Sequence, residues 1–351
     1  MWKRNYLTLF IISLLISHTT LAIQPSASDL VDKYTQALDS TKSFIEHYEK
    51  TTDFSWRLLR GRSGKLQDSG KSFTRGQIKH DDQRIYCQEY NWGDFNLRYK
   101  DLPKDKPYYR CNIADGRDKK IYSNNKWIND SKSSGSAARE PYLREEKVSL
   151  SRHFGISYIV GYIGSDERLD AILRKADRIS VRKKTQNIRG SECFVIDADT
   201  KCGRYSVWLD PEHGYHPAKI RHHAKEGEYN HSHLLTKGET ASAYLNTVRF
   251  EKIDDIWVPM DANSGCYNVA HQGQFVKEDY HYKRTQFILN PDHDKLGSFA
   301  DPILEDPNND PELRNGTPVR LRGVPTRYTW RDGKVVDANG AVIIDGRKGK
   351  K

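Results

Sequence analysis

The sequence predicts an α+β fold, a large curled antiparallel sheet with helices packed in or over its concave face. The elements run as a helix, several strands, a helical stretch and further strands, an order typical of a sheet with helices gathered on one side. Turns rich in Gly, Asp and Asn separate the strand-like runs, which indicates an antiparallel meander. A sheet of about ten twisted strands curls rather than staying flat.

The first helix is expected over residues 29–48. It begins after Ser28, and its apolar residues recur at roughly 3.6-residue spacing with charged residues between them. Such an amphipathic helix needs a sheet or a second helix to cover its apolar face. Its apolar residues are Leu30, Val31, Tyr34, Leu38, Phe44 and Ile45.

Two runs of strands are expected, on either side of a polar loop at residues 131–136 and a helical stretch at residues 140–175. Alternating apolar and polar residues between turn signals predict each strand. The first run comprises residues 54–58, 73–78, 85–90, 95–99, 108–113 and 121–127. The second comprises residues 178–181, 193–196, 205–209, 217–222, 243–250, 256–259 and a long strand at 274–289.

Composition excludes several classes of protein. The chain has 351 residues with 36% hydrophobic and 11% aromatic residues, which is too apolar for an intrinsically disordered protein. The only long apolar run, Leu7–Ile16, is about half of what a membrane-spanning helix needs, so a multi-span membrane protein is excluded.

The first 22 residues have the layout of a secretory signal peptide. Lys3 and Arg4 form the basic start, Leu7–Ile16 forms the apolar segment, and small residues end at Ala22. An uncleaved anchor is the alternative, but the apolar run is short for one. We therefore expect a periplasmic or secreted protein, cleaved after Ala22, with a domain at residues 23–295. A tail rich in Pro, Asp and Asn follows at residues 296–351, with one hairpin around Trp330–Gly333 and Asn339–Gly340.

An exported protein meets oxidising conditions, in which disulfides persist. Cys193 and Cys202 flank the turn-like Asp197–Thr200, so they could face each other across a hairpin. Two other cysteines lie in the strand-like runs 84–90 and 108–113. No C-x-x-C is present, which disfavours a redox-active pair or a four-cysteine zinc site. The predicted bridges are Cys87–Cys111 and Cys193–Cys202, with Cys266 left unbridged.

The apolar part of the helical stretch is the candidate ligand site. It is either a core helix that covers the sheet or the lid of a hydrophobic cavity, and its glycines suit a cover that moves to admit an acyl chain. Trp56, on the first strand, either lines the same space or belongs to the core. The candidate cavity residues are Trp56, Phe154, Tyr158, Ile159, Tyr162 and Ile163.

Motifs of catalysis are absent from the sequence. There is no Gly-x-Ser-x-Gly elbow, no His-Glu-x-x-His and no phosphate-binding glycine loop, so we expect no enzyme and no cofactor. His231 and His233 would share one face of a strand and could bind a metal, but no spaced carboxylates or cysteines complete a ligand set. The alternative, which we favour, is that they are solvated.

Positive charge is in excess, with 57 Lys and Arg against 47 Asp and Glu, but it is scattered and interleaved with acidic residues. A nucleic-acid binder would concentrate it along one stripe, so we expect no nucleic acid. Anionic lipid headgroups, cell-wall polymers or acidic proteins are the expected partners, unless these charges only solvate the surface.

Two segments, Tyr205–Ile220 and Ile253–Met260, carry a family resemblance. The first ends a strand in Trp208-Leu209-Asp210-Pro211, turns at Gly214 and returns with Pro217 and Lys219. The second contains Trp257-Val258-Pro259. Together they resemble the periplasmic outer-membrane lipoprotein carrier (LolA-like) and sensor superfamily over roughly residues 28–290.

The resemblance implies a half-open β-barrel plugged by helices that binds lipoprotein acyl chains or another hydrophobic ligand, without catalysis or a cofactor. The chain departs from the small carriers in its length, its cysteines and its tail, and none of the family's ligand-contacting positions can be matched. The expected function is a lipid or lipoprotein carrier or sensor. The alternatives are an envelope interaction or scaffold module whose cavity is filled by its own side chains and, third, an exported hydrolase or metal-binding protein.

Overall fold

The computed structural model describes residues 24–59, 65–81, 84–93, 108–114, 118–123, 141–143, 159–270, 274–299, 318–320, 327–332 and 334–345. The expected signal peptide lies outside these residues. No helix among them is long and apolar enough to span a bilayer.

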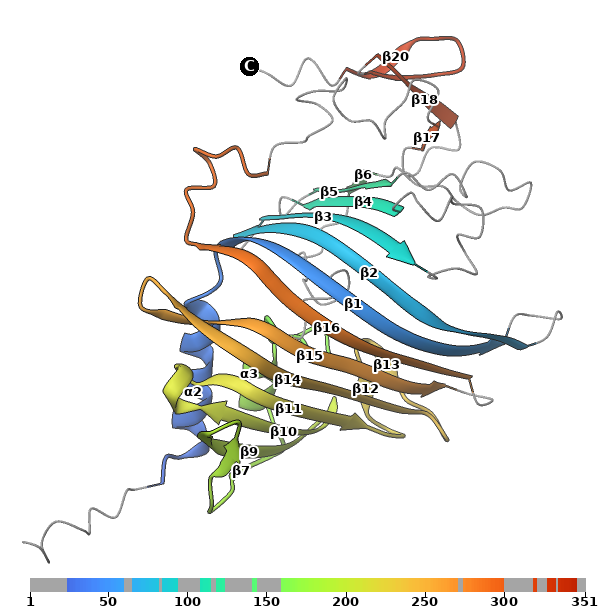
Figure 1. Cartoon of the computed structure of the whole chain (residues 1–351). Coiled ribbons are helices and arrows are strands. Elements are labelled where there is room, and N and C mark those ends of the chain that lie inside the picture. Colours follow the sequence, from blue (N-terminus) through green and yellow to red (C-terminus); the bar gives the residue numbers. More distant parts are fainter. Residues whose placement is uncertain are drawn as a thin grey trace, which may run out of the picture.

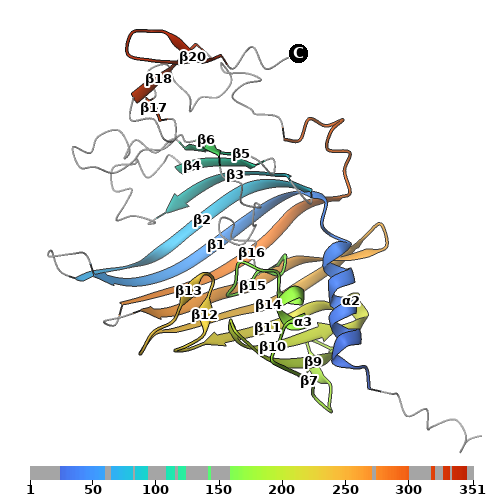
Figure 2. The ribbon, with the colours of Figure 1, turned by 180° about the vertical axis from the view of Figure 1, so that it is seen from behind.

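The described residues form one large antiparallel sheet that is curled but not closed, as the sequence predicted (Figure 1). Helices α2 (Ala27–Asp39) and α3 (Leu169–Arg174) lie on one side of it, which we call the inner face (Figure 2). Figure 1 looks onto the opposite, outer face. The strand order is β6-β5-β4-β3-β2-β1-β16-β15-β14-β11-β10-β9-β7, and β8 also pairs with β9.

The strands of this sheet are long in its centre and short at its edges. The first half comprises β1 (Phe44–Leu59), β2 (Lys65–Asp81), β3 (Arg84–Gly93), β4 (Tyr108–Ala114), β5 (Asp118–Ser123) and β6 (Pro141–Leu143). The second comprises β7 (Arg178–Val181), β8 (Gln186–Ile188), β9 (Ser191–Thr200), β10 (Gly203–Asp210), β11 (His216–Ala224), β14 (Thr240–Ile253), β15 (Ile256–Ala270) and β16 (Gln274–Leu289). The predicted strand 274–289 is confirmed at both ends.

Helix α2 is shorter than the predicted helix 29–48. Ser26 caps it, since its hydroxyl accepts from the Asp29 N–H at 3.1 Å while the Asp29 carboxylate accepts from Ser26 in return. The helix ends at Asp39, and β1 begins at Phe44. Phe44, Glu46 and Tyr48 alternate along β1 rather than repeating with the helical period, and aromatic side chains pack well on a pleated sheet. The consecutive apolar pair Phe44-Ile45 fits both the helical period and the strand alternation. The predicted boundary between helix and strand was therefore wrong.

The predicted helical stretch 140–175 is confirmed at its second segment, where α3 covers residues 169–174, and is wrong in the rest of its described part. Residues 141–143 form strand β6, and residues 159–167 form turns before the short helix α3. Gly161 and Gly164 have φ of +92° and +66°, a conformation that favours glycine and stops a helix. Residues 144–158 lie outside the described part of the chain.

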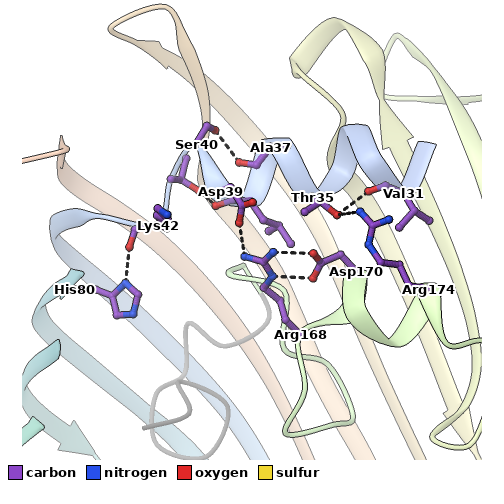
Figure 3. Close-up of polar contacts among 12 residues, drawn as sticks. Val31, Thr35, Ala37, Asp39, Ser40, Lys42, His80, Arg168, Asp170 and Arg174 are labelled. Carbon is purple, nitrogen blue, oxygen red and sulfur yellow. Dashed lines mark hydrogen bonds and ion pairs between the residues drawn. The ribbon is translucent and has the colours of Figure 1, made fainter. Parts of the chain in front are cut away.

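Arg168 fixes this turn segment to helix α2 (Figure 3). Its guanidinium donates two hydrogen bonds of 2.7 Å to the Asp170 carboxylate and one of 2.8 Å to Asp39 at the end of α2. Arg174 makes a second link, donating to Asp32 and Thr35. The pKa of Asp170 is lowered by Arg168 in spite of partial burial, so the carboxylate stays ionised.

Beneath these links lies the main core. Leu30, Tyr34 and Leu38 of α2 are buried together with Ile163, and the Tyr205 hydroxyl of β10 donates to the Ile163 carbonyl at 2.9 Å. The core continues through inner-face residues of β9, β10, β11 and β14, which include Ile196, Ala198, Val207, Ile220 and Leu245. The helices therefore cover the β7–β14 half of the inner face.

The turn between β10 and β11 forms as the sequence predicts. The Asp210 carboxylate accepts from the Glu212 N–H at 3.0 Å and starts the 3-10 turn η5 (Pro211–His213). Gly214 follows in the left-handed region with φ of +67°. The His213 ring stacks on Phe250 and meets Trp257 edge-on, so the two segments that carry the family resemblance pack together.

The structure contradicts both predicted disulfides, since all five cysteines carry thiols. Cys111 lies opposite Gln88, and Cys87 lies opposite Asn112, so the two cysteines point to opposite faces of the sheet. The β9–β10 turn falls at residues 201–202, beyond Asp197–Thr200. Cys202 is therefore in the turn, while Cys193 is at the far end of the hairpin.

Smaller sheets complete the described chain. β12 (Tyr229–Asn230) and β13 (His233–Leu234) form a hairpin on the helix side. In the tail, β17 (Pro318–Arg320), β18 (Arg327–Arg331), β19 (Lys334–Val336) and β20 (Val342–Asp345) form a separate four-stranded antiparallel sheet. One of its turns follows Arg331 and another contains Asn339 and Gly340.

The cysteine geometry predicts the thiol content of the purified protein. Protein expressed under oxidising conditions, unfolded without reductant and treated with iodoacetamide, should gain five carbamidomethyl groups, because no pair of cysteines meets in the fold. Intact mass spectrometry counts the adducts. A mass with three adducts or fewer would contradict the strand register described above.

Candidate ligand-binding face

The structure separates the predicted cavity residues. Ile159 and Ile163 are buried in the main core, and the half-buried Tyr162 packs against it. Phe154 and Tyr158 lie outside the described residues. Trp56 lies on β1, and four strands separate β1 from β10, against which Ile163 packs. The segment 159–163 thus fills the concave space in its own half of the sheet, and Trp56 belongs to the other half.

Around Trp56, the inner face carries a group of side chains that we call the aromatic cluster: the rings of Phe54, Trp56 and Tyr280, together with Val276. Trp56 lies directly opposite Val276, and the rings of Phe54 and Trp56 are 4.8 Å apart. The indole N–H donates to Glu278 at 3.2 Å. Phe54 is buried, and Trp56, Val276 and Tyr280 are half-buried. The Tyr280 hydroxyl donates to the same Glu278 carboxylate, so the cluster combines aromatic rings with one acidic group.

Further along β1 and β16, among residues of the main core, lies a buried ion pair. Glu46 and Arg284 are 0% and 3% exposed, and the Arg284 Nε donates to the Glu46 carboxylate at 2.5 Å. The Tyr282 hydroxyl donates to the other carboxylate oxygen at 2.7 Å, and Arg284 Nη1 donates to the Pro259 carbonyl. Burial, and then the Glu46 charge, raise the pKa of Tyr282, so its hydroxyl stays protonated.

A second polar group lies beside the first. The Tyr48 hydroxyl donates to Glu89 at 2.7 Å, and the Lys50 ammonium is 4.0 Å from the same carboxylate. The Tyr48 ring passes over Gly76 of β2, where a Cβ would stand 2.5 Å from it, so this position requires glycine. The Tyr48 and Tyr282 rings stack 4.9 Å apart and join the two groups.

These polar groups were missed by the sequence analysis. The sequence signal for them lies in β1, where Glu46 occupies an inner-face position between Phe44 and Tyr48, but the helix predicted over 29–48 hides this alternation. A buried Arg–Glu pair adds little stability compared with apolar residues of the same size. The pair does give this half of the inner face a polar strip next to an aromatic one.

The structure gives His231 and His233, the candidate metal ligands, separate partners. The ring nitrogens of His231 and His233 lie 3.0 Å from Asp166 and Glu239 respectively, so each has its own carboxylate partner. His222 points inward, donates from Nε2 to the Cys202 carbonyl at 2.6 Å and contacts the Tyr205 ring. Within the described residues, no group of three or more His, Cys, Asp or Glu side chains could hold a metal ion.

Comparisons with known proteins assign no family. No family model matches the chain, and no curated protein matches it. Among solved structures, the ywiB protein from Bacillus subtilis matches with a TM-score of 0.19 and 7% identity over 71% of this chain and 97% of its own. A structure of lipid–protein interactions in lipovitellin matches with a TM-score of 0.28 and 8% identity over 72% of this chain and 26% of its own. Scores this low carry no inference about function.

The Glu46–Arg284 pair predicts a strong energetic coupling. Arg284→Met alone should lower the free energy of unfolding by about 3–5 kcal/mol, because it leaves the Glu46 carboxylate buried without its cation. The double variant Glu46→Gln/Arg284→Met should recover part of this loss, since the glutamine carbonyl still accepts from Tyr282. Urea unfolding followed by circular dichroism measures all variants in one double-mutant cycle. Additive losses would show that the two side chains do not interact.

His222 predicts a dependence of stability on pH. Burial lowers the pKa of His222 from 6.5 to about 4, and the nearby His223 and His231 act in the same direction. Between these values the unfolded chain binds a proton that the folded chain does not, so stability falls as pH falls from 6.5 to about 4, at up to about 1.4 kcal/mol per pH unit. His222→Gln should flatten the unfolding free energy against pH in this window.

The matched control for His222→Gln is His223→Gln, which replaces an exposed imidazole on the outer face of the same strand. Guanidinium unfolding at several pH values gives the slope for each protein. An unchanged slope in His222→Gln would contradict the burial of a neutral imidazole at this position.

Proposed function

We propose that the protein is a non-enzymatic carrier or sensor for a lipid or an acylated protein, exported to the periplasm or outside the cell. Its ligand lies on the inner face at Phe54, Trp56, Val276 and Tyr280. The observation that carries this proposal is the packing of Phe54 and Trp56 with Val276 opposite on the inner face of an unclosed sheet, away from the strands β7, β9 and β11 that α2 and α3 contact. The resemblance of Tyr205–Ile220 and Ile253–Met260 to lipoprotein carriers supports the same reading.

The arrangement suits an amphipathic ligand. Acyl methylenes lying against Trp56 and Val276 would each contribute about 0.8 kcal/mol on leaving water. Lys50, which lies 5.9 Å from the Tyr280 ring, would stand beside the polar end of such a ligand. The site proposed here thus differs from the predicted lid at residues 154–163, of which the described part is core.

A second candidate is an envelope interaction or scaffold module. It is favoured by Ile163, which is completely buried and fills the concave space under α2 with the protein's own side chain. In that case the aromatic cluster would contact a protein partner rather than a lipid. The two functions differ in whether a small hydrophobic molecule stays with the purified protein.

Native mass spectrometry of protein purified from its own envelope without detergent tests the proposal. We expect a lipid or acylated peptide on the wild type, identified after solvent extraction. Trp56→Ser/Val276→Ser should reduce the bound fraction about tenfold or more, because it removes about 1.4 kcal/mol or more of apolar contact.

The matched control is Tyr229→Ser/Leu234→Ser, which removes an exposed cross-strand apolar pair from the β12–β13 hairpin and should leave the bound fraction unchanged. Circular dichroism checks that both variants are folded. A wild-type mass without any ligand would overturn the carrier proposal in favour of the interaction module, with partner capture as the next step.

A further inference from the structure

A second surface, on the outer face, is separate from the proposed ligand site. It is a groove of about 400 Å³ that crosses strands β10, β11, β14, β15 and β16, the strands in the lower half of the sheet in Figure 1. Its side chains alternate along each strand with inner-face residues such as Tyr205 and Leu245, so they point away from the helices. We call it the basic groove and define it by Arg204, Arg221, His223, Tyr244, Tyr267 and Lys277.

Strand register assembles the basic groove from positions far apart in the sequence. Arg204 lies opposite His223, His223 opposite Ser242, Ser242 opposite Tyr267, and Tyr267 opposite Lys277. A single transverse row thus brings side chains from five strands to one line. Three of the five can carry a positive charge.

Gly265 provides the hollow in the next row. Tyr244 lies opposite Gly265, which lies opposite Asp279, and the Tyr244 hydroxyl reaches across the glycine to donate to Asp279 at 2.8 Å. A Cβ at Gly265 would stand 2.5 Å from the Glu278 carbonyl and 2.8 Å from the Tyr244 ring. The absent side chain therefore lets the tyrosine ring lie flat and form the floor of the groove.

The acidic residues near the groove already have partners. Asp279 accepts from Tyr244 and lies 3.1 Å from the Lys277 ammonium. Asp199 lies closer to Arg178, at 2.9 Å, than to Arg204, at 3.8 Å. The Arg221 guanidinium lies 5.0 Å from the centre of the Tyr244 ring and forms no ion pair within the described residues. The groove therefore keeps a net positive charge.

The positive charge of the groove affects a neighbouring lysine. Lys219, one row away on the same face, lies over the Trp208 ring at 4.5 Å. Its pKa is lowered, first by partial burial and then by repulsion from Arg221 and Arg182. An anion bound in the groove would relieve this repulsion.

An aromatic rim continues the groove at the ends of β15 and β16. Tyr267 is 45% exposed, its ring is 6.2 Å from that of Phe275, and the Arg57 guanidinium lies 5.2 Å from the Phe275 ring. Tyrosine and phenylalanine beside arginine and lysine are the residues that proteins place at the surface of a bilayer. Binding of a soluble anion would require the cationic side chains but not the exposed aromatic rings.

We propose that the basic groove binds the phosphate of an anionic phospholipid headgroup and so docks the outer face of the protein on a membrane surface. Arg221, beside the Tyr244 ring, presents its planar fork to the phosphate oxygens, and Arg204 and Lys277 add positive charge at the two ends of the groove. Tyr267 and Phe275 lie at the level of the headgroups. This docking does not depend on the ligand proposed for the inner face.

Vesicle co-sedimentation of the full chain tests the docking. Wild-type protein should bind vesicles of one part phosphatidylglycerol to three parts phosphatidylcholine and not pure phosphatidylcholine. Arg204→Gln/Arg221→Gln should weaken partitioning roughly 30-fold, at about 1 kcal/mol for each cation removed. Tyr267→Ser should weaken it without any change of net charge.

The matched control is Lys183→Gln/Lys184→Gln, which removes the same charge from an exposed loop outside the groove and should leave binding within about twofold of wild type. Equal weakening by both double variants would overturn the proposal, because it would show general charge attraction. Absence of binding to the anionic vesicles would also overturn it.

Glycerol 3-phosphate distinguishes the two sources of phosphate. If it binds the isolated protein as tightly as the vesicles do, the groove takes a soluble phosphate ester and the membrane docking is wrong. Trp56→Ser/Val276→Ser should bind vesicles like the wild type, so failure of the inner-face proposal and failure of this one give different results.

Discussion

A single curled sheet has two faces, and the burial of its inner face is the constraint on which the rest of this structure depends. Helix α2 is too short to cover fourteen strands. Leu30, Tyr34 and Leu38 bury one half of the inner face, with Ile163 filling the space beneath them. Arg168 holds this cover together through Asp39 and Asp170. The core extends beyond the helices, through Phe44 of β1, Ile78 of β2 and Phe287 of β16.

In the other half of the sheet the inner-face composition changes. Glu46, Arg284 and Tyr282 satisfy one another's hydrogen bonds, and Tyr48 and Glu89 extend the polar strip toward β3. Such groups can be buried because each charge has a partner. They lie among core residues such as Phe44 and Phe287, with Phe54 and Trp56 further along β1, so the proposed ligand would lie beside a polar strip rather than in a wholly apolar cavity.

The two faces of the sheet would then have different roles, ligand binding on the inner face and membrane docking on the outer face. The inner face offers aromatic rings to a hydrophobic ligand, and the outer face offers arginines and tyrosines to phosphate headgroups. The strands β15 and β16 contribute to both, because alternate residues of each strand point to opposite faces. Val276 and Lys277 are neighbours in sequence, yet one belongs to the aromatic cluster and the other to the basic groove.

The sequence by itself determined the fold class, the long strand β16 and the Asp210–Gly214 turn, because period-2 alternation and turn chemistry are local properties. It misplaced the end of α2, since Phe44-Ile45 fits both periods. The predicted cysteine pairs were also wrong, because strand register cannot be read from the sequence and a shift of one residue turns a side chain to the opposite face of the sheet. The candidate site was predicted only in part: Trp56 stays a candidate, while Ile159 and Ile163 proved to be core.

Only the tertiary structure decided which side chains meet. Glu46 and Arg284 are 238 residues apart, and the five strands of the basic groove come together through hydrogen-bonded register rather than through any sequence motif. Scattered arginines and lysines looked like ordinary solvated charges along the chain. Strand pairing places Arg204 and Lys277 on one transverse row and Arg221 on the next row of the same face, whatever their separation in sequence.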